Sequence, residues 1–362
     1  MHDSKQFMFL SANNLATTFA TSRPIWYRKF RTSRSIILFV SSRAAQHSSK
    51  SMSLACALAG GPAAFKDVFV DSRHDPPLPL PKKDHSGGDG DGDALTSNPM
   101  TGQRLYQGTW VMEGWIPGIV QIQNGGGFTP RRGDVILASP PKCGTTWLKA
   151  LAFATMARGA HPPAAPDHPL LRHTPHDCVP FMEVIVSGGW GSKLDALPSP
   201  RLLSTHMPYS TLPASITKNP DCKIVYICRD PKDMVVSMWH FLRHPRPNLS
   251  FNDMFELTCE GRSLCGPFWD HILGYWNAGK TMSGDEGQPE MTSAAVLFLS
   301  FEKLSSLKVN KAGPVVFTKY PRESYFRRGG VGDWMNHMTP EMAHRFDALL
   351  QSKFHGSGLD LL

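Results

Sequence analysis

The chain has 362 residues, of which 41% are hydrophobic and 19% are charged, so it can bury a sizeable core. The formal net charge is +8, but residues 1–50 hold eight Lys or Arg against the single acid Asp3 and therefore carry +7 of it. The remaining +1 excludes a broad basic face for nucleic acid and favours a local site for an anion.

Residues 1–99 are predicted to form an extension outside the folded domain, which we place at 100–362. Residues 1–50 are basic, rich in Ser and Thr and nearly free of acids, which is the composition of an organelle transit peptide and would direct the protein to a plastid. The alternative is an upstream leader or a disordered tail on a cytoplasmic protein. The longest apolar run of this segment, Ile36–Val40, is too short to span a bilayer, so no membrane partner is expected. Residues 76–93 are dominated by Pro, Gly and Asp, which predicts a disordered linker.

Apolar runs at several places predict strands, and some of them are followed by helical patterns. The predicted strands are 134–139, 201–206, 223–228 and 295–299, and the predicted helices are 231–243, 250–260 and 267–278. Pro231 stands in the first turn of the first helix, and Ser250 with Asp253 matches a capping box at the start of the second. Near-continuous hydrophobic strands between helices predict an α/β fold with a central parallel sheet flanked by helices.

A loop of small residues between the first predicted strand and the next helical run, Pro141–Trp147, is predicted to hold an anionic group. Backbone N–H groups are unpaired at the start of a helix, the helix dipole is positive there, and Gly144 allows a close approach. Lys142 adds a full charge, and Thr145 and Thr146 add hydroxyl donors. A nucleoside triphosphate loop places its Lys directly after its second Gly, whereas Lys142 precedes Gly144 by two positions. The loop is therefore P-loop-like but lacks the Walker sequence.

The cysteines and histidines give no sign of a metal site. The chain has seven cysteines, an odd number, and none of them forms a C-x-x-C pair. Reduced thiols fit this usage better than a disulfide or zinc framework. Because no group of His, Cys and carboxylate residues stands at metal-ligand spacing in the sequence, no metal is expected.

A series of short motifs in one order resembles the cytosolic-type sulfotransferases, and among them the soluble enzymes of plants. The resemblance covers roughly residues 100 to 362. The motifs are Tyr106-Gln107-Gly108-Thr109-Trp110, the Lys142 to Trp147 loop with Leu148-Lys149-Ala150-Leu151, Pro175-His176-Asp177, Ser204-Thr205-His206-Met207-Pro208, Cys228-Arg229-Asp230-Pro231-Lys232-Asp233, and Phe326-Arg327-Arg328-Gly329-Gly330-Val331-Gly332-Asp333-Trp334.

The resemblance implies that the co-substrate is 3′-phosphoadenosine 5′-phosphosulfate (PAPS). Its 5′-phosphosulfate would lie on the loop formed by Lys142, Cys143, Gly144, Thr145, Thr146 and Trp147, with the indole of Trp147 on the adenine ring. The 3′-phosphate would contact the residues that match the family's second anion site, which are Arg229, Ser237, Arg327, Arg328 and Gly329. Arginine forks suit phosphate geometry.

Two residues correspond to the family's catalytic groups. His206 follows a predicted strand and corresponds to the base that takes the proton of the acceptor hydroxyl, a task that suits a group that titrates near neutral pH. Lys142 would stabilise the charge that develops on the bridging oxygen as the sulfuryl group leaves. Cys143 departs from the Ser common in the family, a residue thought to restrain the lysine, so we expect altered control of Lys142 and sensitivity of the thiol to oxidation.

The implied acceptor is a small hydrophobic alcohol or phenol of the flavonoid, steroid or hydroxylated hormone class, and the implied protein is a monomer or a homodimer. The aromatic side chains that could line the acceptor pocket or fill the core are Phe181, Trp190, Trp239, Phe241, Phe268 and Trp269.

The stretch between Leu299 and Arg327 is shorter than the family pattern, with an apparent internal deletion near residues 300–302. This departure leaves an alternative open, an inactive truncated isoform that binds the nucleotide without catalysis. A nucleotide kinase is disfavoured because the lysine is misplaced and a metal-holding carboxylate motif is lacking.

Overall fold

A four-stranded sheet forms the centre of the computed structural model, which describes residues 37–41, 61–68, 76–80, 97–98, 100–219, 221–282, 305–311 and 320–359. Strand β5 (Val135–Ala138) pairs in parallel with both β6 (Leu202–Thr205) and β7 (Lys223–Cys228). These three strands confirm the predicted runs and the parallel sheet. The strand predicted at 295–299 lies outside the described residues.

A fourth strand, β1 (Ile37–Ser41), comes from the N-terminal extension and pairs antiparallel with β7, so the order in the sheet is β1-β7-β5-β6. The apolar run of this strand was expected to be too short for a membrane, and no strand was predicted there. The short helix α3 (Phe65–Val68) also joins the fold, because the side chain of Phe65 is fully buried. These described pieces of residues 1–99 contact the folded domain, and the disorder expected for the rest of the extension stays a prediction. The domain boundary at residue 100 stays a prediction.

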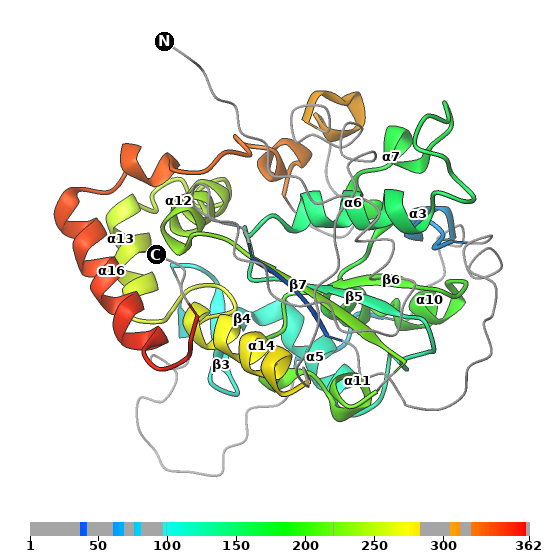
Figure 1. Ribbon diagram of the computed structural model, residues 1–362, viewed down its shortest axis with the longest axis horizontal. Helices are drawn as coiled ribbons and strands as arrows, with labels where there is room; N and C mark the ends of the chain where they lie inside the picture. Colours follow the sequence, from blue (N-terminus) through cyan, green and yellow to red (C-terminus); the bar gives the residue numbers. More distant parts are fainter. Residues whose placement is uncertain are drawn as a thin grey trace.

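The two faces of the sheet are covered by different helices (Figure 1). Helix α6 (Thr145–Met156) lies on one face, and α5 (Ile116–Gln123) and α14 (Phe268–Met282) lie on the other. Strand β5 shows why both faces need cover: Val135 and Leu137 belong to the cluster beneath α6, and Ile136 and Ala138 belong to the opposite one. Side chains alternate between the faces of a strand, so a continuous apolar run fits a strand buried on both sides.

The helices predicted after β7 are confirmed. Helix α12 (Pro231–Leu242) begins at its proline, and the Asp230 side chain accepts a hydrogen bond from the N–H of Lys232. Helix α13 (Phe251–Cys259) has the predicted capping box between Ser250 and Asp253. The third predicted helix is α14.

The remaining elements complete the layers at the two ends of the sheet. They are α7 (Pro169–Arg172), α8 (Pro175–Cys178), α9 (Met182–Ser187), α10 (Gly191–Ala196), α11 (Ala214–Thr217), α16 (Pro340–Phe354) and the 3-10 helices η1 (Glu113–Trp115), η2 (Tyr209–Thr211), η4 (Lys308–Asn310), η5 (Arg322–Tyr325) and η6 (Asp333–Asn336). A small antiparallel sheet consists of β2 (Ser97–Asn98), β3 (Gln103–Tyr106) and β4 (Thr109–Met112). In the part of the chain that the structure describes, none of the helices combines the length and apolar character that a membrane crossing needs.

Candidate functional site

The predicted anion loop connects β5 to α6, at the edge of the sheet where parallel strands end. Gly144 is the N-cap of α6 with a φ of 94°, a left-handed conformation that glycine adopts without strain. Lys142 also has a positive φ, 66°, so the loop turns sharply on either side of Cys143. The hydroxyls of Ser139 and Thr145 are 2.6 Å apart and close the base of the loop. The backbone N–H groups that begin α6 therefore face this edge, as the sequence predicts.

The ammonium of Lys142 is held against the C-terminal part of the chain. Its Nζ donates to the carbonyl oxygen of Ser324 at 3.3 Å and lies 4.0 Å from the ring centroid of Phe241. Burial of the ammonium, with a smaller effect from the nearby guanidinium groups of Arg327 and Arg229, lowers the pKa of Lys142 to about 7. The residue as a whole is only half-buried, but its charged end is enclosed by these groups. A lysine in this state can regain a proton when an anion arrives.

Cys143, which was expected to alter the control of Lys142, lies in the core. Its side chain is 1% exposed and belongs to the hydrophobic cluster on the face opposite α6. Burial raises the pKa of the thiol to about 12, opposed by the charge and the backbone N–H of Arg229. A buried thiol of this kind is inert to oxidation. The structure therefore contradicts the expected sensitivity of Cys143 and assigns the restraint of Lys142 to Ser324.

His206 lies directly after β6, where the sequence predicts it, and the orientation of its ring is fixed. Its Nδ1 is 2.8 Å from the carbonyl oxygen of Ser139, which can only accept, so Nδ1 carries the proton and Nε2 keeps a lone pair. The rings of Phe181 and Trp115 flank it at centroid distances of 4.5 and 6.1 Å. Burial lowers the pKa of His206 to about 3, opposed by the hydrogen bond to Ser139. The neutral tautomer has the form that a general base needs.

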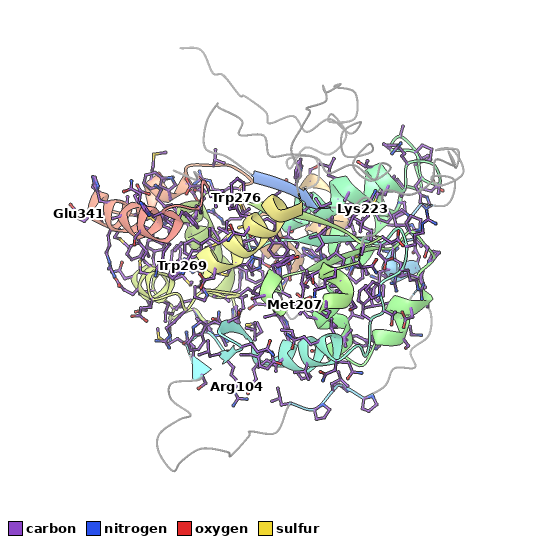
Figure 2. The ribbon with its side chains drawn as sticks, turned by 60° about the horizontal axis from the view of Figure 1, so that its bottom comes forward. Arg104, Met207, Lys223, Trp269, Trp276 and Glu341 are labelled. Atoms are coloured by element: carbon purple, nitrogen blue, oxygen red, sulfur yellow. The ribbon has the colours of Figure 1, made fainter. Side chains whose placement is uncertain are left out.

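The backbone beside His206 is anchored from both sides. The buried carboxylate of Glu183 accepts from the N–H of His206 at 2.8 Å and from the hydroxyl of Thr205 at 3.0 Å. On the other side, His271 of α14 lies with Nε2 3.1 Å from the carbonyl oxygen of His206. The carbonyl oxygen of the next residue, Met207, accepts a hydrogen bond from the hydroxyl of Tyr275 at 2.8 Å. Tyr275 lies on α14, and Figure 2 labels Met207 together with Trp269 and Trp276 of that helix. The position of His206 is therefore determined by contacts distant in sequence.

The second cationic group forms where α12 begins. Arg229 follows β7 and donates to the carbonyl oxygen of Gly330 at 3.0 Å. It also pairs with Asp233 at 3.2 Å, one turn into α12. Asp233 accepts from the backbone N–H groups of Gly332 at 2.7 Å and of Trp334 at 3.1 Å. Asp233 thus holds the loop after Phe326 beside Arg229, and the structure brings together the two predicted halves of a phosphate site.

Arg327 and Arg328 lie on this loop and share one carboxylate. Both guanidinium groups donate to Asp333, one to each oxygen. Partial burial raises the pKa of Asp333, but hydrogen bonds from Arg327 and Asn336 and the charges of both arginines outweigh it and lower the pKa to about 2. The side chain of Arg328 is 62% exposed, and Gly329, which follows it, has a φ of 66°. Arg328 is therefore held at the surface, whereas the side chain of Arg327 is half-buried.

Ser237 and Trp147 are the remaining residues of the predicted nucleotide site. Ser237 lies on α12, one turn after Asp233, and is 8% exposed. Trp147 is partly buried and packs against the hydrophobic cluster beneath α6, as does Phe326 on the opposite loop. The two aromatic side chains reach the same cluster from the two anion loops.

Comparison with known proteins identifies the family. The family model described as "Sulfotransferase domain" matches residues 132–283 and 279–358. Cytosolic sulfotransferase 5 of Arabidopsis thaliana is 37% identical over 299 residues, which cover 72% of this chain and 91% of that protein. The chain belongs to the sulfotransferase family.

Solved structures of related proteins agree with this family assignment. A candidate steroid sulphotransferase from Arabidopsis thaliana has a TM-score of 0.54 and 31% identity, covering 79% of this chain and 99% of that one. A mouse sulfotransferase complexed with PAP has a TM-score of 0.51 and 25% identity, covering 71% of this chain and 96% of that one. The comparisons give no support to the alternative of an inactive isoform or to that of a plastid protein. The predicted transit segment itself lies largely outside the described residues.

The aromatic residues proposed for the acceptor pocket have different surroundings in this sulfotransferase. Phe181 lies against His206, and Phe241 lies beneath Lys142. Phe268 stacks on Phe346 of α16 and belongs to the core. Trp269 also belongs to the core, with 6% exposure. Trp190 is the N-cap of α10, and Trp239 contacts Phe251 and His337.

The structure brings one group of possible metal ligands together. Within the described residues, His240 of α12, Asp333 and His337 place ligand atoms within 4.8 Å of one another, although they are not at metal-ligand spacing in the sequence. Both oxygens of Asp333 are already paired with Arg327 and Arg328, so a cation would meet two guanidinium groups there. The cluster is therefore poorly suited to a divalent ion.

Proposed function

We propose that this sulfotransferase transfers a sulfuryl group from PAPS to a hydroxyl group of a small hydrophobic acceptor. The observation that carries the proposal is the placement of His206. Its Nδ1 proton is committed to Ser139, and the same residue closes the loop of Lys142 through its hydroxyl. The base and the sulfuryl-donor loop are therefore linked through one residue, which aligns the proton acceptor with the leaving group.

Proton removal is assigned to Nε2 of His206. An acceptor hydroxyl becomes a good nucleophile as its proton moves to this lone pair, and its oxygen then attacks the sulfur of PAPS. Burial is the main cause of the pKa of about 3, and the charges of Lys149, His271 and Lys142 lower the pKa further. The negative charge of a bound phosphosulfate opposes these effects and raises the pKa of His206. The base therefore becomes stronger when the donor is bound.

Stabilisation of the negative charge on the departing nucleotide is assigned to Lys142. As the sulfur–oxygen bond breaks, negative charge grows on the bridging oxygen between sulfur and phosphorus. An ammonium fixed beside this oxygen stabilises the transition state more than the ground state. The contact with Ser324 holds the Lys142 side chain at the mouth of the loop until an anion competes for it.

Recognition of the 3′-phosphate is assigned to Arg229, Arg327 and Arg328, together with Ser237 and the backbone at Gly329. Asp333 pairs with two of these guanidinium groups in the unliganded protein and keeps them in position. A 3′-phosphate brings more negative charge and more acceptor oxygens than one carboxylate, so it competes for them. This arrangement selects nucleotides that carry a 3′-phosphate.

The acceptor is proposed to enter beside Phe181 and Trp115, which flank the base. Aromatic walls with one polar group favour a planar or fused-ring alcohol such as a flavonoid, steroid or hydroxylated hormone. A cytosolic location is proposed by analogy with the relatives, whose names carry that word. A monomer or a homodimer is proposed for the assembled protein, without a metal cofactor.

The experiment is to incubate the protein with PAPS labelled at the sulfur and with a panel of flavonoids, sterols and simple phenols. We expect a labelled sulfate ester to form with at least one acceptor class, together with an equal amount of the desulfated nucleotide, 3′-phosphoadenosine 5′-phosphate (PAP). PAP binding without transfer to any member of the panel would overturn the proposed activity. Absence of PAP binding would overturn the assignment of the nucleotide site as well.

A further inference from the structure

Three polar side chains, two of them buried, form a hydrogen-bonded chain that begins at the phosphosulfate loop. His176 is 5% exposed and lies on α8, whose capping box is formed by Thr174 and Asp177. Its Nε2 is 3.0 Å from the hydroxyl of Thr146, and its Nδ1 is 3.1 Å from the ammonium of Lys149. Thr146 and Lys149 are three residues apart on α6, so they lie on the same face of that helix. No role in the proposed reaction has yet been given to His176 or Lys149.

Lys149 determines the direction of these hydrogen bonds. Its residue is fully buried, and its Nζ lies 3.3 Å from the ring centroid of Phe181, the position of a cation over an aromatic face. Burial lowers the pKa of Lys149 well below its ordinary value, and the nearby carboxyl groups of Glu183 and Asp177 oppose this shift. Because these carboxyl groups and the face of the Phe181 ring both stabilise a positive charge, we assign the ammonium form to Lys149. An ammonium has three donors and no acceptor, so Lys149 donates to Nδ1 of His176. Burial and the nearby charge of Lys149 both lower the pKa of His176, which keeps the ring neutral. The single ring proton is then on Nε2.

The consequence falls on the hydroxyl of Thr146. A proton on Nε2 of His176 is donated to Oγ1 of Thr146, which leaves the proton of that hydroxyl to point elsewhere. If this hydrogen bond ran the other way, the hydroxyl of Thr146 would donate to His176 and would present only lone pairs to an anion. Hydrogen bonds aligned in one direction also polarise one another. The chain therefore favours Thr146 as a donor to the loop's ligand.

We propose that Lys149 and His176 are positioning residues that orient the hydroxyl of Thr146 as a hydrogen-bond donor to the 5′-phosphosulfate of the donor nucleotide. The inference rests on the proposed function of the loop, and it adds two residues outside the loop to the recognition of the 5′ group. Neither side chain touches the nucleotide. Their effect is specific to ligands with a 5′ anion, because the 3′-phosphate binds on the other loop.

A purely architectural role for His176 makes a different prediction. Its ring packs against Tyr325 at 4.4 Å and Phe181 at 5.5 Å between centroids, so a change of shape would disturb the whole site. Such a disturbance would weaken every nucleotide. The two roles are separated by comparing PAP with adenosine 3′-monophosphate, which has the same base and 3′-phosphate but no 5′-phosphate.

The experiment measures the binding of both nucleotides by calorimetry to the parent protein and to His176→Phe, which keeps an aromatic ring without its nitrogens. We expect PAP to bind about tenfold more weakly to His176→Phe, the scale of one charge-assisted hydrogen bond, and adenosine 3′-monophosphate to bind equally well. Lys149→Met should give the same pattern. His176→Gln, whose amide can still donate near the position of Nε2, should recover part of the loss.

A double-mutant cycle with Thr146→Val tests the route. We expect His176→Phe to cause no further loss of PAP binding once the Thr146 hydroxyl is gone. Equal losses for both nucleotides, or additive losses in the cycle, would overturn the inference. If the parent strongly prefers PAP over adenosine 3′-monophosphate and His176→Phe keeps the same preference, the inference about His176 is overturned while the proposed function of the loop stands. A parent that binds both nucleotides equally would overturn the proposed function of the loop and this inference with it.

Discussion

Binding of the nucleotide should draw a proton onto Lys142. The pKa of this lysine is about 7 because its ammonium is buried and because Arg327 and Arg229 are nearby. At pH 8, one unit above that value, about 0.9 of the molecules hold a neutral lysine. A bound 5′-phosphate stabilises the ammonium and raises the pKa again. We therefore expect an uptake of about 0.9 proton per PAP at pH 8, about 0.5 at pH 7 and about 0.1 at pH 6.

The sign of the pH dependence follows from the same linkage. Since the bound state holds more protons than the free state above pH 7, the affinity for PAP should fall as pH rises, by up to tenfold per unit. The uptake is measured by calorimetric titration with PAP at pH 8 in two buffers with different enthalpies of ionisation. Lys142→Met is the matched control, because it keeps the length of the side chain and removes the titrating group. An equal uptake in parent and variant would refute the assignment of the pKa and the contact with the 5′ anion.

Three further predictions concern charged and buried groups. Arg229→Ala and Arg328→Ala should each weaken PAP by about 1.5–3 kcal/mol and leave adenosine 5′-monophosphate nearly unchanged in calorimetry, since the arginines face the 3′-phosphate; equal losses for both ligands would assign them to the fold. Arg201→Met should lower the free energy of unfolding in urea by about 3–5 kcal/mol, because Arg201 and Asp134 form a fully buried ion pair and the carboxylate would lose its partner; a loss within experimental error would contradict this. Cys143→Ser should leave the hydrolysis of PAPS without acceptor within about twofold of the parent, because the thiol does not restrain Lys142; a large change in that rate would support the altered control of Lys142 that the sequence leads us to expect.

The parts of the site that are local in sequence were predictable. The loop from Lys142 to Trp147 is contiguous, lies between a strand and a helix, and carries its chemistry in its residue types. His206 and Arg229 each stand directly after a predicted strand, and parallel strands end at one edge of the sheet. Their meeting in space follows from the strand pattern together with the family resemblance.

Other groups at the site have no local signal. Glu183 contacts the backbone of His206 from a separation of 23 residues, and nothing in its neighbourhood marks it as a partner. Ser139 ends a predicted strand, but the direction of its carbonyl depends on the fold of the next loop. Asp333 stood in a recognised motif, although its two arginine partners were not foreseen. Such contacts depend on tertiary packing, which a single sequence does not specify.

Two errors have the same origin. Residues 37–41 were not predicted as a strand, because a short apolar run has no period of its own and this one forms a strand by pairing with β7. Cys143 was expected, from its position in the motif, to have a thiol sensitive to oxidation. The positive φ of Lys142 turns the chain there, and the Cys143 side chain enters the core instead.

The account as a whole depends most on His206 as the base. Its direct test is to measure turnover of PAPS with an identified acceptor and binding of PAP for the parent and for His206→Ala. We predict that turnover falls by about two to four powers of ten while the affinity for PAP stays nearly the same, because the imidazole meets only the acceptor. Near-parent turnover in His206→Ala would contradict the assignment, and a matching loss of PAP affinity would show that His206 supports the nucleotide site instead.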